Sequence, residues 1–242
     1  MPTRDEIINS AQDGDIIWIK PTGAFVPDAP RPLFYPDIDD VIENIDDFLS
    51  AVKAKYANNY TIMALRNLIK TYLLTHPNTK NKLARDPVYI KMVGMLLGRL
   101  YPGHSAIVHY KNGVKSIVEG WGEEPKCVRK MAIEDWYDTN VNYTGGPYAF
   151  WLGRVSGANH AQRARISDFA HSQIGQPFDF FNFDLADTDE YYCSKLGWIA
   201  IYEAMQIPID GMTQTNRVYW FSPKDFIQCD GIAMVCGDKA QY

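Results

Sequence analysis

The sequence predicts an α+β protein built around an antiparallel sheet, and three observations support this fold class. An apolar, β-branched segment occurs near the start of the chain, and strand-like segments return after residue 103. Between them, residues 37–100 contain three stretches with apolar residues at helical spacing. The resulting order is a strand, a helical insertion, a hairpin, and then mixed helices and strands, which is typical of an α+β architecture.

The first half of the chain contains one predicted strand followed by a helical segment. In DGDIIWIK, residues 13–20, the Asp-Gly pair marks a turn and the apolar residues after it indicate a strand. The proline-rich residues 21–36 fit neither a helix nor a central strand, so they are expected to form a loop. Amphipathic helices are then predicted at residues 37–56, 60–74 and 86–100, the last with Asp86 as its N-cap and Pro87 at its first position.

We therefore expect one domain over residues 1–242, with residues 22–100 as a helical insertion within it. The predicted elements of the second half are a hairpin of residues 104–110 and 114–120, a strand at 148–155, a helix at 158–175 ending at Gly175, a helix beginning at Cys193, a strand at 216–221, a helical turn at 222–228 and a strand at 231–237. The helical turn has Ser222 at its N-cap, Pro223 at N1 and Asp225 at N3, which together predict a capping box.

Composition excludes some functional classes. The chain has 242 residues and a formal net charge of −5, which argues against broad nucleic-acid binding because such proteins carry a basic stripe. Apolar runs are too short for an integral membrane segment, and the first residues lack the apolar centre of a signal peptide. The chain as written is expected to be cytoplasmic, or to belong to the cell envelope if a leader was removed. Four cysteines lack CxxC or zinc-type spacing, so we expect mostly reduced thiols, no metal and no cofactor.

One thiol occupies a position that favours reactivity. In EYYCSKLGWIAIYEAM, residues 190–205, Cys193 stands where an apolar helix begins. The unpaired N–H groups and the dipole of a helix N-terminus lower the pKa of a thiol and favour the thiolate. A cysteine at such a place is also commonly an inert core residue, so the functional interpretation requires a base elsewhere in the chain.

The predicted hairpin offers such a base. Residues alternate between the two faces of a strand, so His104 and His109 point to opposite sides. If the loop is Lys111-Asn112, His104 lies directly opposite Glu119; if it is Asn112-Gly113, Glu119 lies opposite Ala106, on the same face as His104. Both registers make His104 and Glu119 cross-strand neighbours. A solvated surface pair is the alternative interpretation of the same pattern.

The order of four segments adds a resemblance to a known family. GDIIWIK, GHSAIVHYKNGVKSIVEGWG, YYCSKLGWIAIYEA and YWFSPKDFIQ follow one another along the chain. This order resembles the circularly permuted branch of the NlpC/P60 papain-like superfamily, in particular its YiiX/YaeF-like group, with lecithin:retinol acyltransferase-like proteins as more distant relatives. The resemblance implies a permuted papain-like core in which Cys193 is the nucleophile, His104 the base and Glu119 the third polar residue.

The chain departs from that family in two respects. Tyr192 precedes Cys193 where non-permuted relatives often carry aspartate, and the helical insertion at 22–100 is not part of the minimal core. The insertion is expected to be either a lid over the site or a structural addition. We expect substrate contacts from Tyr192, from Trp121, and from Tyr35 in the proline-rich loop.

Three functions remain open on the sequence. The first is a cysteine hydrolase, a peptidase or amidase, that cleaves an amide bond; the resemblance implies cell-wall-type peptides as its substrates. The second is an acyltransferase or lipid hydrolase that carries an acyl group as a Cys193 thioester. The third is an inactive domain that binds a peptide, in which Cys193 would be unreactive. The sequence does not indicate an oligomeric state.

Overall fold

The computed structural model describes residues 2–21, 45–77, 86, 88–89, 92–93, 95–96, 103–141, 148–180, 182–216 and 221–242. The chain divides into two compact units, and each is described by itself: unit 1 comprises residues 1–22 and 103–242, and unit 2 comprises residues 23–102. That residues 22–100 are an insertion within one permuted domain stays a prediction.

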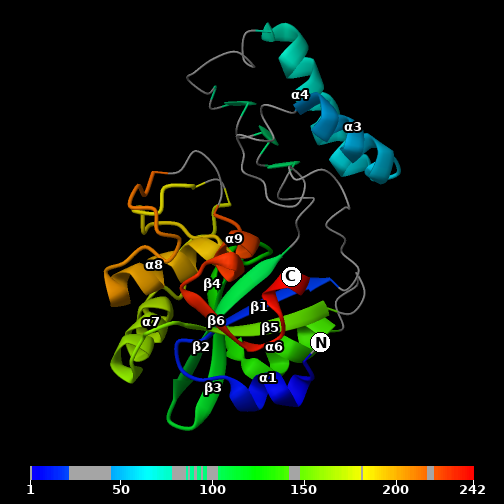
Figure 1. Cartoon of the computed structure of the whole chain (residues 1–242). Coiled ribbons are helices and arrows are strands. Elements are labelled where there is room, and N and C mark those ends of the chain that lie inside the picture. The colour runs from blue at the N-terminus through cyan, green and yellow to red at the C-terminus, as the bar shows by residue number, and fades with distance from the viewer. Residues whose placement is uncertain are drawn as a thin grey trace. The chain divides into compact units, whose positions relative to one another are not determined.

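Unit 1 is built on a six-stranded antiparallel sheet, which confirms the α+β class with an open antiparallel sheet (Figure 1). Along the sheet the strands follow the order β4-β3-β2-β1-β5-β6, so β1 and β2 lie at its centre. The strands are β1 (Ile16–Pro21), β2 (His104–Lys111), β3 (Val114–Trp121), β4 (Cys127–Ala132), β5 (Tyr148–Val155) and β6 (Ile232–Cys236).

Helices cover both faces of this sheet. On one face, alternate residues of β1, β2 and β3 pack with α1 (Arg4–Ser10) and α6 (Ile133–Val141) into a buried apolar cluster that includes Ile7, Ile17, Val108, Ile117 and Trp136. Toward the other face lie α7 (His160–Ser172) and α8 (Cys193–Met205), which are side by side in Figure 1. The short α9 (Pro223–Gln228) and the 3₁₀ helix η3 (Lys239–Gln241) complete the unit.

The turn of the β2–β3 hairpin selects one of the two registers open on the sequence. Lys111 pairs with Val114, and Asn112 and Gly113 between them both have positive φ angles, of 53° and 80°. Two such residues are characteristic of a tight two-residue hairpin loop. The loop is therefore Asn112-Gly113, and the pairing of Ile107 with Val118, continued by one residue, places Ala106 opposite Glu119.

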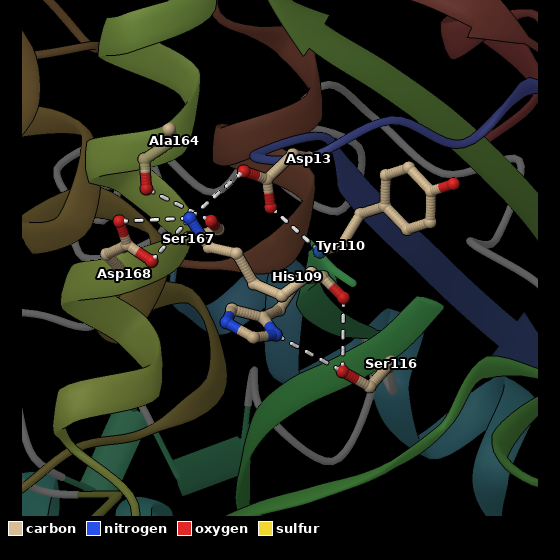
Figure 2. Close-up of polar contacts among 8 residues, drawn as sticks. Asp13, His109, Tyr110, Ser116, Ala164, Ser167 and Asp168 are labelled. Carbon is tan, nitrogen blue, oxygen red and sulfur yellow. Dashed lines mark hydrogen bonds and ion pairs between the residues drawn. The ribbon is translucent and has the colours of Figure 1, made fainter. Parts of the chain in front are cut away.

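A polar cluster attaches α7 to the hairpin end of β2 (Figure 2). The ammonium of Lys111 lies 3.0 Å from a carboxylate oxygen of Asp168 on α7, and Asp13 accepts a hydrogen bond of 2.8 Å from the N–H of Tyr110. The ring of His109 stacks on that of His171, with 4.4 Å between the ring centres. Because His104 begins β2 and Lys111 ends it, this cluster lies at the opposite end of the strand from His104.

Unit 2 contains the predicted amphipathic helices, as far as its residues are described. They are α3 (Ile45–Tyr56), α4 (Tyr60–Thr75) and the helical residues 88–89, 92–93 and 95–96. The side chain of Asn59 caps α4, and Asp86 accepts hydrogen bonds from the N–H groups of Val88 and Tyr89, as an N-cap does. The predicted stretch 37–44, the proline-rich loop with Tyr35, and Pro87 lie outside the described residues.

The structure corrects and extends the predicted elements. The helix expected at 158–175 is α7, which begins after the capping residue Asn159 and ends at Ser172; Gly175 lies beyond it, in a turn whose N–H bonds the carbonyl of Val128 on β4. Four elements of unit 1 were not predicted: α1, β4, α6 and η3. The predicted strand at 216–221 falls mostly on residues 217–220, which are outside the described part.

Two general properties follow from the described residues. None of the helices in these ranges combines the length and the apolar character needed to cross a membrane. The cysteines Cys127, Cys193, Cys229 and Cys236 are all free thiols.

Candidate active site

Cys193 is the first residue of α8, and its sulfur lies among hydrogen-bond donors. The preceding residue, Tyr192, is the N-cap of α8, and its side chain makes no capping hydrogen bond to the first turn of this helix. The backbone N–H groups of Ser105 on β2 and Ser194 in the first turn of α8 are near enough to the sulfur to lower its pKa. The helix N-terminus therefore directs its polar groups to the thiol.

The side chain of His104 connects Cys193 to a buried carboxylate. The imidazole of His104 lies close enough to Cys193 for each group to shift the pKa of the other, and its Nε2 lies 2.6 Å from Oε2 of Glu119. Because Nε2 is engaged by Glu119, Nδ1 is the nitrogen left for the sulfur. The structure therefore brings Cys193, His104 and Glu119 together, although Cys193 is far from the other two in the sequence.

Three side chains hold Glu119 in place. The carboxylate is only 1% exposed, and Arg129, its direct cross-strand partner on β4, contacts Oε1 with Nε at 2.7 Å and Nη2 at 2.6 Å. The indole Nε1 of Trp136 on α6 donates to Oε2 at 2.6 Å, beside the contact with His104. Glu119 is thus a fixed acceptor for His104, with its negative charge balanced by Arg129.

The charges of the three groups are coupled. Burial opposes the charge on His104, but the neighbouring Cys193 and Glu119 outweigh it and raise the pKa of His104 to about 10. Burial likewise opposes the thiolate, yet His104 and the N–H groups of Ser105 and Ser194 lower the pKa of Cys193. Burial would raise the pKa of Glu119, but His104, Arg129 and Trp136 together lower it. These directions favour a thiolate and an imidazolium over two neutral side chains.

An aromatic and cationic pair borders the imidazole. The half-buried ring of Trp121 meets the ring of His104 edge-on, with 6.5 Å between centres. The guanidinium of Arg129 stacks on the ring of Trp121, with its Cζ atom 3.5 Å from the ring centre. Arg129 therefore serves both Glu119 and Trp121, and it ties the position of the aromatic ring to that of the carboxylate.

A glycine allows the start of α8 to approach β3 closely. A Cβ atom at Gly120 would lie 3.1 Å from the carbonyl carbon of Tyr192 and 3.2 Å from the backbone nitrogen of Cys193. These distances are shorter than ordinary contacts with main-chain atoms, so any larger residue would push α8 away from the sheet. Gly120 thus sets the position of the Cys193 main chain beside Glu119.

Two of the three residues predicted to contact substrate lie within the described residues, in different environments. Tyr192 is fully buried and its hydroxyl accepts a 3.1 Å hydrogen bond from the N–H of Phe221, so its side chain stabilises the interior; its contact with substrate stays a prediction. Trp121 lies beside His104, and its contact with substrate stays a prediction. Tyr35 lies outside the described residues.

Two residues of the site, Arg129 and Trp136, were not predicted from the sequence. Arg129 pairs with Glu119 only because β4 follows the hairpin, and β4 was not among the predicted strands. The stretch AIEDWYDTNV, with its acidic first turn, carries a helix signal that places Trp136 on α6. Within the described residues, no group of three or more His, Cys, Asp or Glu side chains is arranged to hold a metal ion.

Comparisons with known proteins found a partial structural likeness, which is a similarity only. No protein-family model matches the chain, and no curated protein matches it. A solved structure, described as metalloprotein YiiX of Escherichia coli O157:H7 (DUF1105), is similar to part of the chain. The two share 17% sequence identity with a TM-score of 0.43, over 56% of this chain and 82% of YiiX. The assignment of the site therefore depends on the contacts described above.

Proposed function

We propose that the protein is a cysteine hydrolase, a peptidase or amidase, that cleaves an amide bond with Cys193 as nucleophile. The observation that carries this proposal is the 2.6 Å contact of His104 with the buried Glu119 beside Cys193, with a lowered pKa at the thiol and a raised one at the imidazole. A nucleophile, a proton carrier and an orienting carboxylate are the groups that thiol catalysis requires.

In the first step the thiolate of Cys193 attacks the carbonyl carbon of the substrate. As the tetrahedral intermediate collapses, the C–N bond breaks and the leaving nitrogen takes the proton that His104 carries. The products of this step are a free amine and a thioester on Cys193, with His104 neutral. An imidazole that is protonated at neutral pH is suited to this reaction, because an amine is a poor leaving group without a proton.

In the second step water hydrolyses the thioester. Neutral His104 accepts a proton from the attacking water, the C–S bond breaks, and the acid product leaves with the thiolate–imidazolium pair restored. Glu119 holds Nε2 of His104 throughout, so the other nitrogen stays directed at the reacting atoms. We assign the backbone N–H of Cys193, at the helix N-terminus, as one donor to the oxyanion of both steps.

The proposed substrate is a peptide or another amide-containing molecule. Trp121 beside His104 offers a half-buried aromatic surface for a substrate side chain or main chain. The family resemblance adds cell-wall-type peptides as the class to test first. Nucleic acid is not a proposed partner, because the formal net charge of −5 opposes binding to phosphate backbones.

The test is to detect the thioester and its hydrolysis. The protein is incubated with short peptides of cell-wall type, with general peptide amides and with a lipid acyl donor, and peptide mapping by mass spectrometry locates any acyl adduct. We expect amide cleavage and an adduct on Cys193, both lost in Cys193→Ala. Cys229→Ala is the matched control, because burial raises the pKa of Cys229 to about 12 and leaves it a poor nucleophile.

The three candidate functions give different outcomes. An adduct that forms only with the lipid donor, and that passes to an acceptor other than water, would assign the acyltransferase function instead. Absence of any adduct from all three classes, with a folded protein, would favour the inactive binding domain. Cys193→Ala should change the melting temperature by only a few degrees, since it removes a small side chain at the N-terminus of α8.

A further inference from the structure

A tyrosine from a distant part of the chain reaches the site from the side of β1. Tyr242 follows η3, and its side chain is 6% exposed. Its hydroxyl donates a hydrogen bond of 3.3 Å to the carbonyl of Ile19 on β1. Ile19 is the direct partner of His104 in the β1–β2 ladder, so this hydroxyl binds the main chain beside the residue that carries the imidazole.

The same hydroxyl lies within electrostatic range of the thiol. Burial, and after it the negative charge of Cys193, raise the pKa of Tyr242 well above its ordinary value. The phenol therefore stays protonated over the whole pH range in which a thiolate–imidazolium pair exists. Tyr242 acts on the site as a fixed neutral dipole and not as a second acid.

The sequence leaves room for this hydroxyl. A Cβ atom at Gly103, the residue before His104, would overlap the oxygen of Tyr242 and would lie 3.4 Å from Cβ of Pro223 on α9. Glycine is therefore the residue that fits here, because the absence of a Cβ atom lets the phenol approach the main chain of β2.

The rest of the Tyr242 segment is anchored firmly. Its ring meets the ring of Trp151 edge-on at 5.0 Å, and Lys20 lies 5.5 Å from the centre of each ring while donating to the main-chain carbonyls of Gln241 (3.0 Å) and Tyr242. Two more bonds attach the preceding residues: from the indole of Trp151 to the carbonyl of Asp238 (3.0 Å), and from the side chain of Gln228 to the carbonyl of Lys239 (2.9 Å).

We propose that Tyr242 is a positioning residue, whose hydroxyl fixes the start of β2 and thereby the imidazole of His104 relative to Cys193. This inference rests on the proposed function, because positioning matters only if the pair reacts. The hydroxyl binds Ile19, the ladder partner of His104, and lies against Gly103, so it acts on the reacting atoms only through His104. Without it, the carbonyl of Ile19 loses this hydrogen bond at the end of the ladder that holds His104.

The charged and titratable groups around Tyr242 define what a pH experiment reports. Cys193 and His104 face it from α8 and β2, and Lys20 faces its ring from β1. Lys224 on α9 interacts with Lys20, and burial together with this repulsion lowers the pKa of Lys224. Replacing the hydroxyl alone changes none of these charges, so a shifted profile would report a changed geometry of the Cys193–His104 pair.

The test compares Tyr242→Phe with Tyr191→Phe. Tyr191 is a matched control because it is also fully buried and its hydroxyl also makes one hydrogen bond, to Oε1 of Gln173 at 2.9 Å. The readout is the rate of Cys193 alkylation by iodoacetamide as a function of pH, followed by peptide mapping, with the melting temperature of each variant. We expect both variants to melt a few degrees lower.

Only Tyr242→Phe should move the alkylation profile to higher pH, with alkylation at pH 6 slower by about three- to ten-fold, which corresponds to a pKa rise of about half to one unit. Gly103→Ala, which displaces the hydroxyl but keeps the tyrosine, should shift the profile in the same direction. An unchanged profile in Tyr242→Phe, or equal shifts in both tyrosine variants, would overturn the positioning role while the wild-type profile still supports the proposed function. An ordinary thiol profile in the wild type would overturn the proposed function and this inference with it.

Discussion

The imidazole of His104 and the carboxylate of Glu119 meet across 2.6 Å, on neighbouring strands of one hairpin. Glu119 is 1% exposed and is also held by Arg129 and Trp136, so the carboxylate cannot rotate away from the ring. The consequence is that His104 keeps one nitrogen on Glu119 and offers the other to Cys193. A carboxylate fixed in this way orients the imidazole and stabilises its charged form.

Replacing the two partners should have unequal effects on turnover. His104→Ala removes the proton carrier and should lower kcat to the level of Cys193→Ala. Glu119→Gln keeps an acceptor oxygen near Nε2, so its loss in kcat should be about 100-fold smaller, in line with the orienting residue of other triads. Steady-state kinetics on the same amide substrate measure both. Equal and complete losses would mean that Glu119 does more than orient the ring.

Glu119 should also make the stability of the fold depend on acid pH. Its folded-state pKa is lowered from an ordinary value of 4.5, so its contribution to stability is fully present above about pH 4.5 and is lost as pH falls through the lower folded pKa. Glu119→Gln should lower the melting temperature at pH 7, because it leaves the Arg129 guanidinium partly unpaired.

The difference in melting temperature between Glu119→Gln and the wild type should become smaller as the pH is lowered, since wild-type Glu119 then becomes neutral as well. Thermal melts of both proteins between pH 7 and pH 3 provide the measurement. A constant difference in melting temperature across this range would contradict the ionised state of Glu119 in the fold.

Gly120 should be intolerant of a side chain. In Gly120→Ala the added methyl would lie 3.1 to 3.2 Å from the main chain of Tyr192 and Cys193, so α8 must move away from β3 by a few tenths of an ångström. We expect kcat to fall by at least ten-fold, because small displacements of a nucleophile are costly. Gly113→Ala is the control at the exposed hairpin turn, where it strains a positive φ angle but leaves the site untouched. Similar kinetics in both variants would count against a role for Gly120.

The helical segment should be removable from unit 1. Ile19 near the end of β1 pairs directly with His104 at the start of β2, so the two ends of the excised segment lie side by side and a short loop can join them. A protein in which residues 23–102 are replaced by a short Gly/Asn linker should fold and retain alkylation of Cys193 at low pH. If its substrate preference changes, the segment takes part in specificity; if preference and turnover are unchanged, the lid hypothesis is wrong.

Much of the site was predictable because it depends on local patterns. Strand alternation placed His104 and Glu119 on one face in either register, and the apolar run after Cys193 placed the thiol at a helix start. The register itself was decided by the Asn112-Gly113 turn, which the sequence left as one of two choices.

The remaining parts depend on long-range packing. Arg129 reaches Glu119 because a third strand, β4, continues from the hairpin, and Tyr242 reaches Ile19, the ladder partner of His104, because η3 folds back on β1. The apparent helix end at Gly175 was misplaced because a turn that pairs with β4 follows α7. The burial of Tyr192 was not predicted, because it is decided by contacts across the core and not by its neighbours in sequence.

The central claim is that Cys193 and His104 form a thiolate–imidazolium pair, and the pH dependence of Cys193 alkylation tests it most directly. In the wild type, Cys193 should react with iodoacetamide at pH 6, well below the range of an ordinary thiol, while Cys229, with a pKa near 12, stays unmodified in the same sample. In His104→Ala the reaction of Cys193 should move to pH 9 or above, because burial then acts on the thiol without its positive partner. Identical profiles in the two proteins, or a wild-type Cys193 that reacts only above pH 9, would contradict the account.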